Sequence, residues 1–366
     1  MITPAARRQP WISQPWLDGF FILLPPFACL LFIALFPGLF QNTDDLSEAW
    51  WVALVLLVDV AHVYSTLYRT YLDPQARQQH RYLLYIIPIL SFAAAALVYS
   101  VSVRWFWRLL AYVAVYHFVR QQYGFLRLYS RHEQAPAWAR RIDAIMIYSA
   151  TLYPLLHWHL TAGRNFHWFV SGDFWYLSAP QWLPLLQGAY LLVLLAYVAK
   201  EGWWIYRQRC INWPRNLVVL GTALSWYVGI VALNGDMAFT LLNVVSHGVP
   251  YMALIWVHGQ KNYRPAGQRT SPVLRLIFQR GWWWLFLLLI FALAFAEEGL
   301  WDLAVWQEHR QVFGWLHSGQ VEVPAALLNV VVPLLTVPQL THYIIDGFIW
   351  RIRQDNFKWN AEVRTN

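Results

Sequence analysis

The sequence predicts an all-α fold, a polytopic integral membrane bundle of about ten transmembrane helices with both termini in the cytoplasm. Across 366 residues, 58% are hydrophobic and only 13% are charged, whereas an ordinary soluble domain is about one quarter charged. Long apolar runs recur along the whole chain, and Lys and Arg concentrate in alternate loops. These observations indicate helices buried against one another in lipid.

Each span is identified as a run of about 20 predominantly apolar residues, the length needed to cross a bilayer. No soluble stretch of domain size interrupts these runs, so residues 1–366 are expected to form a single membrane domain. The expected spans are 18–40, 49–71, 82–103, 105–127, 142–162, 181–200, 216–234, 237–260, 281–300 and 322–350.

The basic residues define the expected orientation of the spans. If the spans alternate in direction, 22 of the 27 Lys and Arg residues fall at the two termini or in the loops after even-numbered spans, each counted with its adjoining inner helix end. Positive charge favours the cytoplasmic side, which predicts an N-in/C-in, multi-pass protein of a bacterial-type inner membrane. Topology thus explains the net charge of +8, so we expect the lipid bilayer and no nucleic acid as a partner.

Four of the expected spans carry ionisable side chains at similar depth. Such groups are costly in a membrane and usually face the bundle interior. All four spans run from outside to inside, and three histidines lie about 12 to 15 Å from the inner ends, with His247 about 20 Å away. The polar residues are Asp59, His62, Thr66 and Arg69; His117, Arg120 and Gln121; Asn243, His247 and His258; and Gln339, His342 and Asp346.

Histidines from four helices at one depth predict a metal site. Imidazole is the commonest metal-ligating side chain, and nearby carboxylates either ligate or orient the ring. We expect His62, His117, His247 and His342 to hold the ion, with Asp59 and Asp346 as ligands or supporting partners. A site of this type without cysteine suits iron best, with zinc or manganese as alternatives. A two-metal version would add His258.

Other polar residues near these histidines are candidates for catalysis and substrate binding. Tyr64, Arg120 and Tyr251 are expected to act catalytically, and Arg69, Arg120 and Gln121 to bind the polar head of an amphipathic substrate. The structural alternative makes the arginines partners of nearby aspartates or snorkelling side chains, and the tyrosines packing residues.

The pattern of one histidine per helix resembles the bacterial Brp/Blh type of membrane carotene dioxygenase, in which four histidines from separate helices hold an iron. The residues that carry the resemblance are Asp59-x-x-His62, His117, His247 and His342-x-x-x-Asp346. It covers the arrangement of the site and no sequence motif, and it implies an iron-dependent membrane oxygenase.

The leading hypothesis is therefore a membrane-embedded metal-dependent oxidoreductase that acts on a lipophilic small molecule. Three alternatives stay open. Paired histidines can be axial ligands of haem in an electron carrier, and intramembrane Asp and His residues also mark the routes of ion- or proton-coupled transporters. A metal-free lipid transferase could use a histidine as a base.

Overall fold

A computed structural model describes residues 9–40, 46–164, 167–264, 271–317 and 323–350, and every regular element within these ranges is a helix. The prediction of an all-α fold is therefore confirmed. The chain ends, on which the expected N-in/C-in orientation depends, lie outside the described residues, as does Glu322 at the start of the last expected span.

Seven described helices are long and apolar enough to cross a membrane, or eight if a bent pair counts as one span. They make this a multi-pass membrane protein by length and composition. The seven are Glu48–Arg69, Arg81–Val101, Pro180–Gln208, Trp213–Ala232, Asp236–Asn262, Trp283–Trp306 and Ala325–Ile349.

The expected number of about ten spans is not confirmed. Helices α7 (Val103–Tyr129) and α8 (Ala137–Leu160) lie where two further spans were expected, but neither is apolar enough to be counted. Charged and other polar side chains lower the hydropathy of both helices, because α7 contains four arginines, a histidine and two glutamines, and α8 contains two arginines, an aspartate and two histidines.

The bent pair lies at the first expected span. Helix α1 (Pro15–Asp18) continues into the π-helical turn η1 (Gly19–Leu23), and α2 (Pro25–Leu35) follows at an angle of 53°. Proline supplies no backbone N–H and clashes with the preceding helical turn, so a new helix begins at Pro25. The short 3₁₀ turn η2 (Pro37–Leu39) follows.

The chain forms two compact units whose sequences interleave. Unit 1 comprises residues 1–45, 115–166 and 174–247, and unit 2 comprises residues 46–114, 167–173 and 248–366. Helices α7 and α11 (Asp236–Asn262) each contribute residues to both units.

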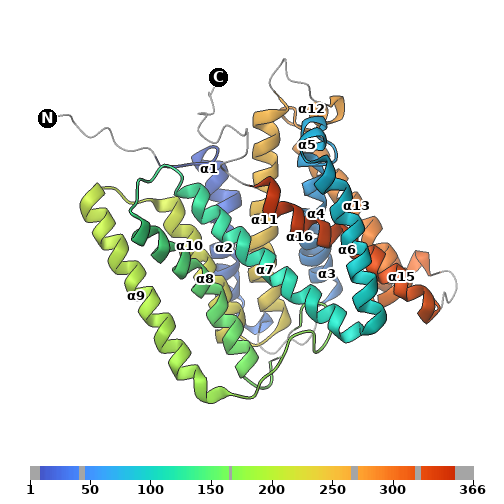
Figure 1. Ribbon diagram of the computed structural model, residues 1–366, viewed down its shortest axis with the longest axis horizontal. Helices are drawn as coiled ribbons and strands as arrows, with labels where there is room; N and C mark the ends of the chain where they lie inside the picture. Colours follow the sequence, from blue (N-terminus) through green and yellow to red (C-terminus); the bar gives the residue numbers. More distant parts are fainter. Residues whose placement is uncertain (1–8, 41–45, 165–166, 265–270, 318–322, 351–366) are drawn as a thin grey trace. The chain divides into compact units, whose positions relative to one another are not determined.

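In unit 1, helix α8 packs against both α9 (Leu183–Gln208) and α10 (Trp213–Trp226), shown in green to yellow in Figure 1. The π-helical turn η6 (Tyr227–Ala232) extends α10, and the 3₁₀ turn η5 (Pro180–Trp182) precedes α9. Asn212 caps α10 by accepting a hydrogen bond from the backbone N–H of Arg215 at 3.1 Å.

A network of buried charged groups joins α8, α9 and α10 within unit 1. Lys200 forms ion pairs with Asp143 and Glu201. Arg215 forms ion pairs with Glu201 and with Glu133, the latter at 2.6 Å. Burial raises the pKa of Glu133, while Arg215 and Asn212 oppose that rise. Lys200 of α9 and Arg215 of α10 thus both approach Asp143 of α8, which links the three helices.

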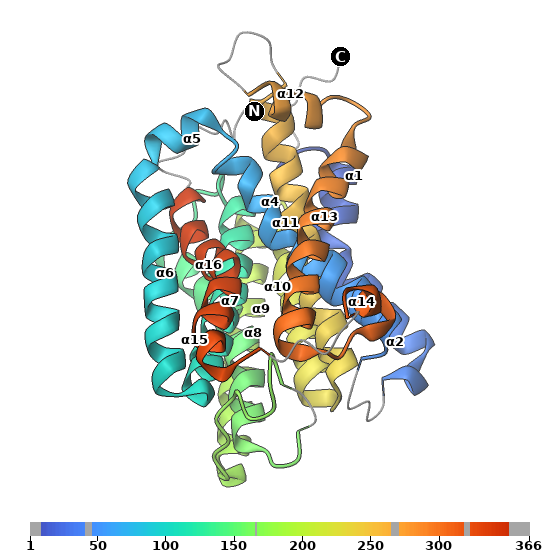
Figure 2. The same ribbon diagram turned by 90° about the vertical axis from the view of Figure 1, so that its right-hand side faces the viewer.

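In unit 2, helix α6 (Arg81–Val101) packs along α15 (Ala325–Leu335) and α16 (Val337–Ile349), which Figure 2 shows in blue-green and red. Helix α13 (Trp283–Trp301) packs against α4 (Ala61–Ser65) and η3 (Val52–Val60). The remaining elements are α3 (Glu48–Trp51), η4 (Thr66–Arg69), α5 (Pro74–Gln79), α12 (Pro272–Ile277), η7 (Asp302–Trp306), α14 (Arg310–Phe313) and η8 (Gly314–Leu316).

The second expected span is one helical rod of changing pitch. The α-helical turn α3 widens to the π-helix η3, returns to the α-helix α4 and tightens to the 3₁₀-helix η4. Segments of π-helix are rare and commonly occur at functional sites, because the extra residue re-aims the side chains that follow. His62 comes two residues after η3 ends.

Candidate metal centre

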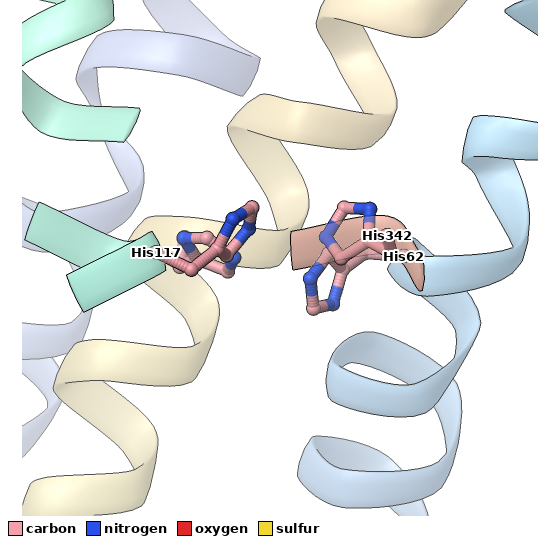
Figure 3. Close-up of side chains that lie close together, drawn as sticks. His62, His117 and His342 are labelled. Carbon is pink, nitrogen blue, oxygen red and sulfur yellow. The ribbon is translucent and has the colours of Figure 1, made fainter. Parts of the chain in front are cut away.

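Within unit 2, His62 of α4 and His342 of α16 lie side by side (Figure 3). Their ring centroids are 5.0 Å apart and the rings meet nearly edge to face, at 77°. Both side chains are buried. Burying two imidazoles together in a membrane helix bundle is costly unless their nitrogens are satisfied, so this pair is a strong candidate for metal binding.

The Nδ1 atoms of both rings lie near oxygen acceptors. His62 Nδ1 is 3.3 Å from the carbonyl oxygen of Val58 and 3.8 Å from Oδ1 of Asp59. His342 Nδ1 is 3.7 Å from Oδ1 of Asp346. A carbonyl oxygen only accepts, so the ring of His62 donates from Nδ1, which leaves Nε2 as the nitrogen with a lone pair. Asp59 and Asp346 are thus neighbours of the rings, as expected of supporting partners.

Within unit 1, His117 of α7 and His247 of α11 form a second pair with the same geometry. Their ring centroids are also 5.0 Å apart, at 78°, and both are buried. Figure 3 shows His117 projecting from α7. Phe118 stacks on the ring of His247 with centroids 3.6 Å apart, and Gln121 donates from Nε2 to the backbone oxygen of His247 at 2.8 Å.

The four histidines on which the sequence prediction centred form one group that can hold a metal ion. Each residue is between 0% and 4% exposed. Each offers one ring nitrogen, and these nitrogens lie within 4.8 Å of one another. Imidazole nitrogens bind zinc at about 2.0 to 2.1 Å, so a shared ion would need one nitrogen of each ring at that distance.

The other expected site residues have different surroundings. Arg69 is buried, donates to the backbone oxygen of Ile349 and lies over the ring of Trp350 at 3.7 Å. Arg120 is exposed and donates to the hydroxyl of Tyr148. These contacts involve neither an aspartate nor a predicted ligand, and a role of the two arginines in substrate binding stays a prediction.

Tyr64 and His258 also contact residues outside the histidine group. Tyr64 is hydrogen-bonded to Glu297. His258 is buried against the rings of Tyr263 and Trp350, with centroids 5.6 and 6.2 Å away, and the group of four does not include it. The two-metal version of the site stays a prediction.

Tyr251 lies directly against the histidine pair of unit 2. Its ring centroid is 5.8 Å from that of His62 and 5.1 Å from that of His342. Its hydroxyl donates to Oδ1 of Asp346 at 2.7 Å. Tyr251, one of the three residues expected to be catalytic, therefore directly contacts two of the predicted ligands.

Two residues in contact with the site were given no role in the sequence prediction. Thr66 was noted as polar and given no role, yet its Oγ1 is 2.7 Å from Nδ1 of His342. Gly248 has no side chain, and α11 approaches η3 so closely there that a Cβ would meet the backbone oxygen of Val58 at 3.0 Å. A glycine directly after an intramembrane histidine is the one signal that could have indicated this contact.

The fold and site define a polytopic helical membrane protein with a buried group of four histidines. No protein-family model, no curated protein and no solved structure matches the chain. The function must therefore be argued from the residues of the site.

Proposed function

We propose that this chain is a membrane-embedded metalloenzyme, iron-dependent and oxidative, that acts on a lipophilic substrate. The observation that carries the proposal is the group of four buried histidines. His62, His117, His247 and His342 would hold the ion. When bound, such an ion supplies an open coordination position for oxygen or water and the redox chemistry that side chains lack.

The donor set fits iron, zinc or manganese better than a soft metal. The ligand atoms are imidazole nitrogens, and carboxylates lie beside two of the rings. Both cysteines of the chain, Cys29 and Cys210, are outside the group. Iron is preferred because neutral nitrogen ligands with nearby carboxylates are typical of non-haem iron sites.

The geometry within each pair argues against bis-histidine haem ligation by that pair. Two axial ligands must lie on opposite faces of a porphyrin. Ring centroids 5.0 Å apart, with the rings edge to face, leave no space for a macrocycle between His62 and His342 or between His117 and His247. A Soret band that develops when haem is added to the purified protein would support haem ligation instead.

The membrane location supports a lipophilic substrate. The helices that carry the histidines belong to a chain with at least seven segments apolar enough to cross a bilayer. A substrate dissolved in the bilayer could reach the site laterally without passing through water. The expected orientation would place the site toward the cytoplasmic leaflet.

Metal analysis of the purified full-length protein tests the proposal. We expect about one equivalent of iron per chain, with zinc or manganese as the less favoured results, and its loss in His62→Ala and His342→Ala. His258→Ala is the matched control, because it also removes a buried imidazole but should leave the metal content unchanged. If the wild-type protein contains no stoichiometric iron, zinc or manganese, the proposal is wrong.

Variants that remove one pair at a time show whether a single ion needs all four histidines. We expect His117→Ala/His247→Ala and His62→Ala/His342→Ala each to reduce bound metal to near zero. If only one pair were required, the other double variant would retain its metal. Lipid mass spectrometry of cells that produce wild type or His62→Ala should then reveal an oxidised lipid present only with wild type.

A further inference from the structure

A chain of hydrogen bonds in unit 2 leads from His342 to Asp346 through two hydroxyl groups. His342 Nδ1 is 2.7 Å from Thr66 Oγ1. Thr66 Oγ1 is 2.8 Å from the hydroxyl oxygen of Tyr251. That hydroxyl is 2.7 Å from Oδ1 of Asp346. Thr66, Tyr251 and His342 are all buried, and the chain connects η4, α11 and α16.

The direction of every bond in this chain follows from its carboxylate end. Oδ1 of Asp346 is the acceptor, so Tyr251 donates its single hydroxyl proton to it. Tyr251 must then accept from Thr66, which uses the single proton of Thr66. The remaining contact of Thr66 is with His342 Nδ1, so the threonine oxygen accepts and the imidazole donates there.

The consequence is a defined tautomer for His342. With its proton on Nδ1, the neutral ring has its lone pair on Nε2, and Nε2 is then the nitrogen that can ligate a metal. A direct His342–Asp346 hydrogen bond would give the same tautomer, but the 3.7 Å separation of Nδ1 and Oδ1 is too long for one. The two hydroxyl groups bridge that gap.

We propose that Thr66, Tyr251 and Asp346 are positioning residues that fix His342 in its Nδ1–H tautomer and so present Nε2 to the metal. The inference rests on the proposed metal site and extends it. Carboxylates and carbonyl groups commonly accept a hydrogen bond from the second nitrogen of a metal-bound histidine. Here a threonine and a tyrosine transmit the effect of the carboxylate.

Metal affinity of full-length protein purified in detergent and stripped with a chelator tests this role, with Co²⁺ and Zn²⁺ as probes. We expect Thr66→Val to weaken binding about 10- to 100-fold, the usual effect of losing such a partner. Thr66→Ser keeps the hydroxyl and should restore wild-type affinity. Tyr251→Phe should weaken binding in the same range, because Thr66 then loses the acceptor that orients it.

Two control variants separate positioning from general loss of a buried hydroxyl. Thr70→Val removes a buried hydroxyl whose bond goes to the backbone oxygen of Thr66. Tyr68→Phe removes a buried phenol that donates to the backbone oxygen of Phe286 at 2.9 Å. Both controls should bind metal like wild type even if they lower the melting temperature.

The outcomes distinguish failure of this inference from failure of the proposed function. If wild type binds neither Co²⁺ nor Zn²⁺, the metal site itself is wrong, and the positioning role falls with it. If wild type binds metal and Thr66→Val binds it as tightly as Thr70→Val does, only the positioning role is wrong. The positioning role would also be wrong if Thr66→Ser did not restore metal affinity, because the hydroxyl group would then not be what orients His342.

Discussion

Replacing Arg215 by methionine is expected to lower the free energy of unfolding by about 3–5 kcal/mol, the usual effect of removing one partner from a buried ion pair. The Arg215 side chain is 1% exposed and pairs with Glu133 and Glu201, while Asp143 lies 3.9 Å away. Without the guanidinium, Lys200 is the remaining cation of this network, so the three carboxylates lose most of the positive charge that compensates them.

Thermal or denaturant unfolding of the purified protein in detergent measures this effect. Arg207→Met is the matched control, since Arg207 is exposed at the end of α9 and only lies over Trp203 at 5.8 Å. It should change stability by no more than about 0.5 kcal/mol. Adding Glu201→Gln to Arg215→Met should recover part of the loss. An Arg215→Met protein as stable as Arg207→Met would contradict the assigned role of the network.

The sequence could predict the helices because lipid imposes a simple rule on the backbone. Every polar backbone group in a bilayer must be satisfied internally, so long apolar runs become helices. Helix ends were less predictable. The sixth expected span stopped at Lys200, but α9 continues to Gln208, so Lys200 and Glu201 lie two turns inside it. Ionisable residues within a membrane-spanning helix usually face the bundle interior and pair with one another, so this Lys-Glu pair could have indicated buried partners.

The four histidines could be predicted because ionisable residues in apolar helices are rare and share a common depth. Asp59 and Asp346, which share a helix with their histidines, were expected as neighbours. Thr66 was not expected as a partner, because hydrogen bonds also form between residues far apart in the chain. Thr66 and His342 are 276 positions apart, and no periodicity within one helix relates them. The role expected of Arg120 stays a prediction: it lies in the same helix as His117, and its guanidinium donates to the hydroxyl of Tyr148.

Sequence patterns also could not predict the changes of helix type along the second span. Hydrophobic runs predict a helix, but they do not distinguish the π-helical segment Val52–Val60 from an ordinary α-helix. Val58 belongs to this segment, and its backbone carbonyl oxygen accepts a hydrogen bond from the ring of His62 and so orients it. The site therefore depends on a local change of backbone pitch as well as on the choice of histidine.

Replacing Gly248 by alanine is expected to weaken metal binding as well as stability. Within unit 2, a methyl group at this position would lie 2.7 Å from Cγ1 of Val58 and 3.0 Å from its backbone oxygen. Overpacking of this kind costs about 1–3 kcal/mol, which outweighs the gain of up to about 1 kcal/mol from replacing glycine in a helix. The displaced carbonyl is the acceptor for His62 Nδ1, so the ring of His62 should lose its fixed orientation.

Two other glycines of unit 2 separate these effects. Gly259→Ala should also destabilise the protein, because its methyl group would lie 2.1 Å from the buried ring of Phe278, but it should leave metal affinity unchanged. Gly347→Ala meets no atom within 4 Å and should be neutral or slightly stabilising. Unfolding curves and Co²⁺ titrations of the three variants give the comparison. If Gly248→Ala binds Co²⁺ as tightly as Gly259→Ala does, the close approach of α11 to Val58 serves packing alone, and the orientation of His62 must have another source.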